Sequence, residues 1–101
     1  MTIRIVPAVH PGEYLREELL KPLGLTPYAL ARNLKVPRTR IERLVREETG
    51  VTPDTALRLA RFFGISPEFW INMQGAYDLE LAEATSATAL AEIEPLRADA
   101  A

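Results

Sequence analysis

The chain has 101 residues, 48% of them hydrophobic, which is enough for one small domain with its own core and excludes a largely disordered polypeptide. It contains no cysteine, which excludes a disulfide framework or a zinc ribbon and is typical of a cytoplasmic protein. The formal net charge is −2, but residues 32–46 hold six basic residues against Glu42, whereas residues 68–101 hold seven acidic residues against Arg97. The basic segment predicts phosphate binding, and the acidic one indicates another task, such as binding a basic partner.

No stretch of the chain is apolar enough to span a membrane, and the apolar patch near the N-terminus lacks the long uninterrupted core of a signal peptide. We therefore expect a soluble, cytoplasmic protein that does not associate with a membrane.

Residues 1–9 are predicted to be an N-terminal extension, and weak alternation within 2–9 indicates a short edge strand that Pro7 limits in length. The first helix is predicted to begin at His10 and Pro11, because proline suits the first helical position, and to end at Pro22 and Gly24. His10 precedes this helix directly, so a capping or surface role is expected for it.

Residues 26–46 predict two short helices joined by a tight turn. Thr26 is placed to cap the first helix, and Pro27 suits its first position. Pro37 disfavours helix at the residue before it, so residues 33–37 are expected to form the turn. The second helix has a narrow apolar stripe consisting of Ile41, Leu44 and Val45.

The solvent side of this second helix is rich in arginine. Its exposed first turn and the face opposite the apolar stripe carry Arg38, Thr39, Arg40, Arg43 and Arg46. Arginine can donate two hydrogen bonds to guanine, and the threonine methyl group suits thymine, so the pattern predicts a DNA-recognition helix. Arg32 and Lys35, in the same basic segment, complete the predicted DNA-binding set. The alternative interpretation is an ordinary solvated helix face that happens to be rich in arginine.

Two further helices have the same start signal. Thr52-Pro53-Asp54 and Ser66-Pro67-Glu68 each offer a capping hydroxyl, then proline, then an acidic residue near the positive end of the helix dipole. The fourth helix is predicted to end at Gly64, and Gly50 in the preceding loop is able to take a left-handed backbone. The predicted core includes Ile41, Leu59, Phe63, Phe69 and Trp70.

The fifth helix is apolar on more than one side, because Ile71 and Leu79 lie away from its main apolar pattern. We predict a twofold dimer contact through this helix and the segment beyond it, since twofold proteins read twofold operators. The alternative is that these are scattered surface residues. Residues 82–101 are an Ala-rich C-terminal segment, expected to be a loose helix or a mobile tail, with a candidate edge strand at 93–96 and a frayed end.

The residues that catalysis needs are not gathered anywhere in the sequence. Ser66 is explained as a helix cap and Ser86 lies in the Ala-rich segment, so neither is a credible nucleophile. Metal-ligand spacing and phosphate-loop spacing are both missing. We expect no enzymatic activity, no metal and no cofactor.

Three sequence blocks, together with Leu30-Ala31 and Val36-Pro37, match a known pattern over about residues 10–81. The blocks are His10-Pro11-Gly12-Glu13 with Leu15; Thr52 to Gly64; and Ser66-Pro67-Glu68-Phe69-Trp70 with Asn72, Gln74 and residues 77–79. In these blocks the chain resembles the Cro/C1-type (XRE) helix-turn-helix family and, more narrowly, the HigA-type antitoxins. The Ser-Pro-Glu-Phe-Trp block is the most specific part of the resemblance.

The resemblance implies an all-α fold: a five-helix Cro/C1 (lambda repressor-like) DNA-binding domain over residues 10–81, with short N- and C-terminal extensions. It implies an antitoxin of a type II toxin–antitoxin pair that binds double-stranded operator DNA as a homodimer, represses its own operon and neutralises a basic, HigB-like mRNA endonuclease toxin. By the same resemblance, the helix after Val36-Pro37 reads bases, which assigns that role to Arg38, Thr39, Arg40 and Arg43.

Four residues, at three places in the chain, depart from the family pattern. Pro27 replaces a glutamine that often contacts phosphate, Lys35 replaces a turn glycine, and Glu47-Glu48 replaces a basic, glycine-rich loop. These changes predict weakened operator binding, and an uncomfortable backbone or a different turn at Lys35. Two other functions therefore stay open: a stand-alone helix-turn-helix transcriptional repressor without a toxin partner, and a protein-interaction module whose DNA binding has decayed.

Overall fold

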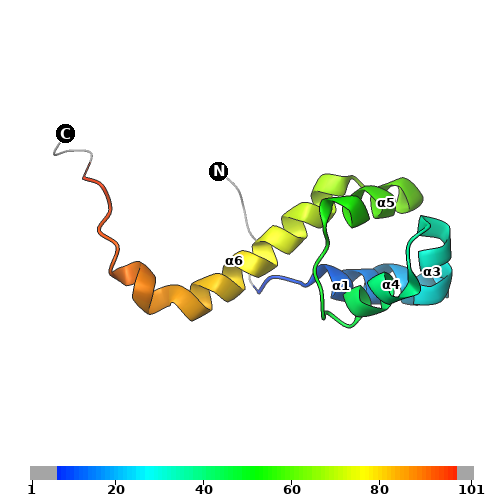
Figure 1. Ribbon diagram of the computed structural model, residues 1–101, viewed down its shortest axis with the longest axis horizontal. Helices are drawn as coiled ribbons and strands as arrows, with labels where there is room; N and C mark the ends of the chain where they lie inside the picture. Colours follow the sequence, from blue (N-terminus) through cyan, green and yellow to red (C-terminus); the bar gives the residue numbers. More distant parts are fainter. Residues whose placement is uncertain (1–6, 98–101) are drawn as a thin grey trace.

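The computed structural model describes residues 7–97, and every regular element within them is a helix (Figure 1). The helices are α1 (Pro11–Tyr14), η1 (Leu15–Leu20), α2 (Lys21–Leu23), α3 (Pro27–Leu34), α4 (Arg38–Val45), α5 (Pro53–Phe63) and α6 (Pro67–Ala91). The backbone stays right-handed helical at Leu15 and Lys21, so α1, η1 and α2 form one continuous helix. The predicted all-α fold with five helices is confirmed.

Helix starts follow the predicted capping chemistry. The cap acceptors are His10 Nδ1 for Gly12 N at 2.9 Å, Thr26 Oγ1 for Ala29 N at 3.0 Å, Thr52 Oγ1 for Thr55 N at 3.3 Å and Ser66 Oγ for Phe69 N at 3.2 Å. A proline follows each cap, where no backbone donor is needed. The capping role expected for His10 is confirmed.

The middle of the first helix, η1, is π-helical, which the sequence pattern did not predict. Leu15 and Leu20 are both buried, although residues five apart lie about 140° apart around an ordinary α-helix. Hydrogen bonds from i to i+5 widen the turn and bring two such residues toward one side. The π-helical turn therefore places both leucines in the core.

Three helices end in one hydrogen-bond pattern around a left-handed residue: Gly24 at φ 62°, Lys35 at φ 62° and Glu47 at φ 63°. In each case this residue donates to the carbonyl three residues back, and the next N–H donates to the carbonyl five residues back. The uncomfortable backbone expected at Lys35 is therefore present, within an ordinary helix-ending motif.

The prediction that Gly50 takes a left-handed backbone is wrong, because Glu47 turns the chain after α4 instead. Gly50 instead leaves room for the end of the Gln74 side chain. A Cβ atom there would lie 2.7 Å from the Gln74 side chain, whose Oε1 accepts a hydrogen bond from Val51 N at 2.7 Å. The loop is thus attached to α6.

The core lies between the first helix, α3, α4, α5 and the start of α6. Its fully buried large side chains are Leu15, Leu30, Ile41, Leu44, Leu59 and Trp70. The predicted core residues Phe63 and Phe69 are only partly buried and pack against this cluster. Tyr14 and Phe69 both contact the Trp70 ring edge to face, with centroids 5.9 and 5.5 Å from it.

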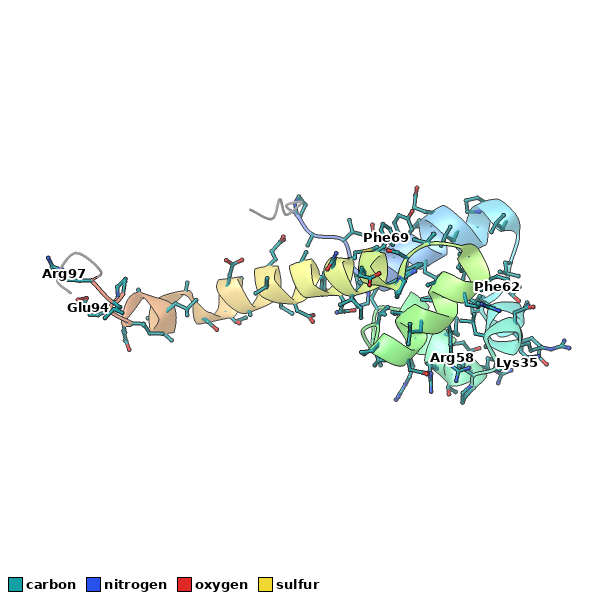
Figure 2. The ribbon with its side chains drawn as sticks, turned by 90° about the horizontal axis from the view of Figure 1, so that it is seen from above. Lys35, Arg58, Phe62, Phe69, Glu94 and Arg97 are labelled. Carbon is teal, nitrogen blue, oxygen red and sulfur yellow. The ribbon has the colours of Figure 1, made fainter. Side chains whose placement is uncertain are left out.

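Helix α6 is a rod that starts in the helical globule and projects out of it (Figures 1 and 2), which gives the molecule extents of 58 × 23 × 22 Å. It continues through the Ala-rich segment to Ala91, as expected for alanine, the residue with the strongest helix propensity. Residues 93–96 are irregular in the single chain, and the pairing of this segment as an edge strand across a dimer stays a prediction.

The strand predicted within residues 2–9 lies mostly outside the described residues, and residues 7–9 are irregular. None of the helices in residues 7–97 is long and apolar enough to cross a membrane.

Candidate nucleic-acid interface

Helices α3 and α4 pack against each other and are joined by the turn at residues 35–37. The predicted apolar stripe of α4 is buried at Ile41, Leu44 and Val45. The predicted DNA-binding residues are all exposed: Arg32, Lys35, Arg38, Thr39, Arg40, Arg43 and Arg46. The sequence therefore separated the buried and solvent faces of α4 correctly.

Two of these arginines are engaged with carboxylates. Arg40 Nη1 lies 2.6 Å from Asp54 Oδ2, and Arg38 Nε lies 3.4 Å from Glu42 Oε2 on its own helix. Arg43 and Arg46 form no ion pair with another described residue. Exposed ion pairs such as those of Arg38 and Arg40 contribute little to stability, so each of these two arginines can exchange its carboxylate for a phosphate at small cost.

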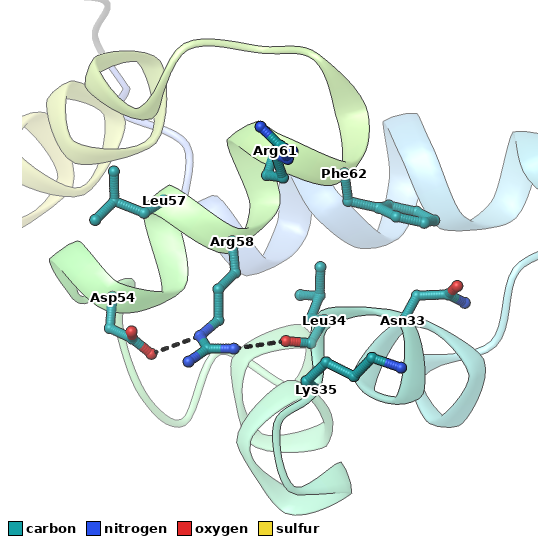
Figure 3. A pocket seen from close by; sticks show the side chains of 8 residues that line it. All are labelled: Asn33, Leu34, Lys35, Asp54, Leu57, Arg58, Arg61 and Phe62. Atoms are coloured by element: carbon teal, nitrogen blue, oxygen red, sulfur yellow. Dashed lines mark hydrogen bonds and ion pairs between the residues drawn. The ribbon is translucent and has the colours of Figure 1, made fainter.

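Asp54 connects α4 to α5. Arg58 Nε lies 3.0 Å from the same Oδ2 atom that Arg40 contacts, and its Nη1 donates to Leu34 O at 2.8 Å (Figure 3). Hydrogen bonds from Arg40 and Arg58 hold the pKa of the Asp54 carboxyl below its ordinary value. Only a helix-dipole role was predicted for Asp54, although the i,i+4 spacing of Asp54 and Arg58 was a signal for this ion pair.

An exposed ring lies between the two basic helices. The guanidinium carbons of Arg32 and Arg38 lie 5.9 and 5.8 Å from the centroid of the Tyr28 ring. Tyr28 is in the first turn of α3, Arg32 is one turn further along, and Arg38 begins α4. The sequence analysis did not single out Tyr28, although its i,i+4 relation to Arg32 was visible.

The end of α4 is held by Arg16 from η1. Its Nη1 donates to Val45 O and lies 3.2 Å from Glu47 Oε2, and its Nε lies 2.8 Å from Glu17 Oε2. Glu47, one of the departures from the family pattern, is therefore paired with an arginine of the same chain. This pairing offsets part of the negative charge that Glu47 adds beside α4.

A shallow hollow lies on the side of the helix-turn-helix, between the end of α3 and α5 (Figure 3). It is lined by Asn33, Leu34, Lys35, Asp54, Leu57, Arg58, Arg61 and Phe62. Arg58 crosses its floor between Asp54 and Leu34 O. Residues 7–97 contain no group of three or more histidine or carboxylate side chains that could hold a metal ion.

Two packed helices joined by a tight turn, with an arginine-rich solvent face on the second, define the helix-turn-helix class of DNA-binding proteins. Residues 15–70 match the helix-turn-helix family HTH_3, so the chain belongs to that family.

Individual proteins of known name are similar to this chain over most of its length. Virulence-associated protein I of Dichelobacter nodosus is 59% identical over 78 residues, which are 77% of this chain and 72% of that protein. Antitoxin HigA-1 of Vibrio cholerae is 41% identical over 71 residues, 70% of this chain and 67% of that protein. The solved structure of the Pseudomonas aeruginosa antitoxin HigA with the higBA promoter has a TM-score of 0.86 at 44% identity, covering 89% of this chain and 99% of that one. The resemblance to HigA-type antitoxins is confirmed.

Proposed function

We propose that this protein is the antitoxin of a type II toxin–antitoxin pair, which binds operator DNA as a homodimer and represses its own operon. One observation carries the proposal: the outward face of α4 is rich in arginine, in a chain that is similar over almost its whole length to a HigA antitoxin solved with promoter DNA.

In this proposal α4 enters the major groove, and α3 crosses the sugar–phosphate backbone. Thr39 and Arg43 lie about one helical turn apart on the exposed face and read base edges, with Arg43 donating two hydrogen bonds to a guanine. Arg46, at the end of α4, binds a phosphate.

The remaining basic residues complete the interface. Arg38 and Arg40 begin α4 and take up base contacts after leaving Glu42 and Asp54. Arg32 and Lys35 add positive charge along the backbone. Because the phosphate contacts of Arg46, Arg32 and Lys35 release counterions, affinity falls steeply as salt rises.

The dimer uses the second side of α6. Ile71, Leu79 and Leu90 lie within about 100° of one another around the helix and are 38%, 55% and 51% exposed, so together they form an apolar strip that the single chain leaves uncovered. A twofold contact there covers both copies of the patch at once and sets two α4 helices toward one face of DNA.

The second partner is a HigB-like mRNA endonuclease toxin, a small basic protein. Acidic side chains on α6 and just beyond it provide the charge complementarity: Glu68, Asp78, Glu80, Glu83, Glu92 and Glu94. The two activities then belong to different regions, with DNA binding on the basic helices and the toxin near the acidic ones.

Coexpression tests the antitoxin part. The basic protein encoded beside this chain is expressed with and without it, and growth and copurification are measured. We expect growth arrest from the neighbour alone, relief by this chain, and recovery of both proteins in one complex. A neighbour that neither arrests growth nor binds would remove the antitoxin function.

A reporter driven by the promoter upstream of this chain tests the DNA part separately. Repression without any toxin partner would indicate a stand-alone repressor. Loss of both repression and DNA binding would leave a protein-interaction module with decayed DNA binding.

A further inference from the structure

We propose that Tyr28 is a positioning residue of the DNA interface, whose ring holds Arg32 and Arg38 in the place from which both bind the operator. The inference rests on the proposed function and adds to it a residue that the helix-turn-helix pattern does not assign. The juxtaposition that carries it is one half-exposed ring with two guanidinium groups within 6 Å of its centroid.

The position of the ring is the first argument. Tyr28 lies in the first turn of α3, which crosses the backbone when α4 enters the major groove. Arg38 is the first residue of α4, the end of a recognition helix that contacts DNA. The ring therefore lies at the junction between the phosphate-facing and base-facing helices.

The energetics of the two arginines are the second argument. An exposed arginine side chain loses rotamer freedom when it is fixed on a ligand, and fixing it beforehand reduces that loss on binding. The face of an aromatic ring attracts a guanidinium group, and it does so without neutralising the charge that DNA needs. Glu42, the other partner of Arg38, does neutralise it.

The exposure of Tyr28 is the third argument. The residue is 51% exposed and lies outside the buried core, so packing does not explain a ring at this position. The two cations that lie over its ring, Arg32 and Arg38, are residues that the DNA-binding proposal already uses. Holding those two side chains is the role that its surroundings support.

The test uses the full chain and a DNA duplex that the wild-type protein selects from a randomised pool. Affinity is measured for the wild type, Tyr28→Phe, Tyr28→Leu and the control Phe62→Leu, which also removes a partly exposed ring, one that packs against Phe63. We expect Tyr28→Leu to weaken binding by about twofold to fivefold, the size of one exposed cation–π contact, with the other two variants near wild type. If Tyr28→Phe loses as much as Tyr28→Leu, the hydroxyl is the active group and the inference is wrong.

A second measurement separates positioning from direct contact and from misfolding. Tyr28→Leu is added to a protein that already carries Arg32→Ala and Arg38→Ala, and binding is compared at low salt, where affinity is highest. A ring that acts through the two arginines changes nothing further in this background. An undiminished loss would mean that the ring touches DNA itself or supports the fold, which overturns the inference.

The same assay separates this inference from the function on which it rests. If the wild type selects a duplex and the Arg43→Ala variant is less selective, the proposed DNA function stands, whatever the result for Tyr28. A wild-type protein that selects no duplex removes both proposals together.

Discussion

Gly12 lies where the first helix meets the recognition helix, with no room for a side chain. A Cβ atom at this position would be 1.8 Å from Leu44 O and 3.1 Å from His10 Nδ1. The backbones of α1 and α4 therefore approach each other directly, and the orientation of α4 depends on that approach. Gly75, inside α6, has nothing within 4 Å of the equivalent position.

We expect substitution by alanine to change the stability of the protein in opposite directions at these two glycines. Gly12→Ala should destabilise the protein by about 1–3 kcal/mol or more, because the new methyl group meets backbone rather than a movable side chain. Gly75→Ala should stabilise it by about 0.5–1 kcal/mol, since alanine favours a helix interior. Urea unfolding of both variants measures these changes. Equal stability of Gly12→Ala and wild type would mean that α1 and α4 lie further apart than described.

Contacts between the first helix and α6 depend on His10. Its side chain is only 4% exposed, caps α1, and packs edge to face on Tyr77 of α6 with ring centroids 4.8 Å apart. Burial lowers the pKa of His10, and the nearby carboxylates of Glu47 and Asp78 oppose that effect only in part. Since Nδ1 accepts a hydrogen bond, the neutral imidazole is the form that the fold requires.

The lowered pKa sets the sign of a pH dependence. The unfolded chain takes up a proton on His10 near its ordinary pKa of about 6.5, whereas the folded chain does so only at lower pH. His10 therefore contributes stability that is fully present above the pKa of the unfolded chain and is lost as pH falls through the lower pKa of the folded chain.

We expect wild type to lose more unfolding free energy between about pH 7.5 and 5.5 than His10→Asn, which keeps a capping acceptor but has no titrating group. Urea midpoints at both pH values check this. The same pH response in both proteins would show that His10 titrates alike in the folded and unfolded chains.

Helix boundaries could be predicted from the sequence because their causes are local. The hydroxyl caps, the prolines after them, and Gly24 and Gly64 at helix ends act within a few residues of themselves. The π-helical turn could not be predicted, because it depends on the burial of Leu15 and Leu20 in a core that is built from segments distant in the sequence. The wrong assignment of Gly50 has the same origin, since its neighbour Gln74 is far away in the sequence.

The sequence predicted which residues of α4 are buried and which are exposed, but it did not predict which charged residues form ion pairs. Helical periodicity separates Arg43 from Ile41 without any tertiary information. The pairing of Arg40 with Asp54 joins two helices across a loop, so no spacing rule reveals it. The projection of α6 as a single rod to Ala91 was also undetermined, because the Ala-rich segment fits a loose helix and a tail equally well.

The shape of the whole molecule points to a partner for α6. The rod projects from a small helical globule (Figure 2), and its outer half exposes Leu79, Leu81 and Leu90 at more than half of their surface. Ala8 N donates to Glu80 Oε2 at 2.7 Å, which connects the segment before α1 to the rod. A second copy of the chain along the side of α6 that carries Leu79 and Leu90 would bury both of these leucines.

Replacing Leu79 and Leu90 together by Glu should convert a micromolar dimer into a monomer, since charge on an apolar contact opposes burial on both subunits. Leu57→Glu, on an exposed position of α5, is the matched control and should leave the dimer intact. Sedimentation velocity measures the state of each. A dimer that survives the double substitution would place the interface elsewhere, for example on the first helix, and a monomeric wild type would remove it.

The central claim is that the outward face of α4 reads sequence, and Arg43 and Arg46 test it together. Each is changed to Ala, and binding to the selected duplex and a scrambled one is measured over a salt series. Arg43→Ala should cost about 1–3 kcal/mol on the selected duplex and relax specificity at one position in each half-site. Arg46→Ala should weaken both duplexes alike and reduce the salt slope by about one unit per protomer. Equal losses from both variants on both duplexes would make Arg43 a phosphate contact and α4 merely a charged face.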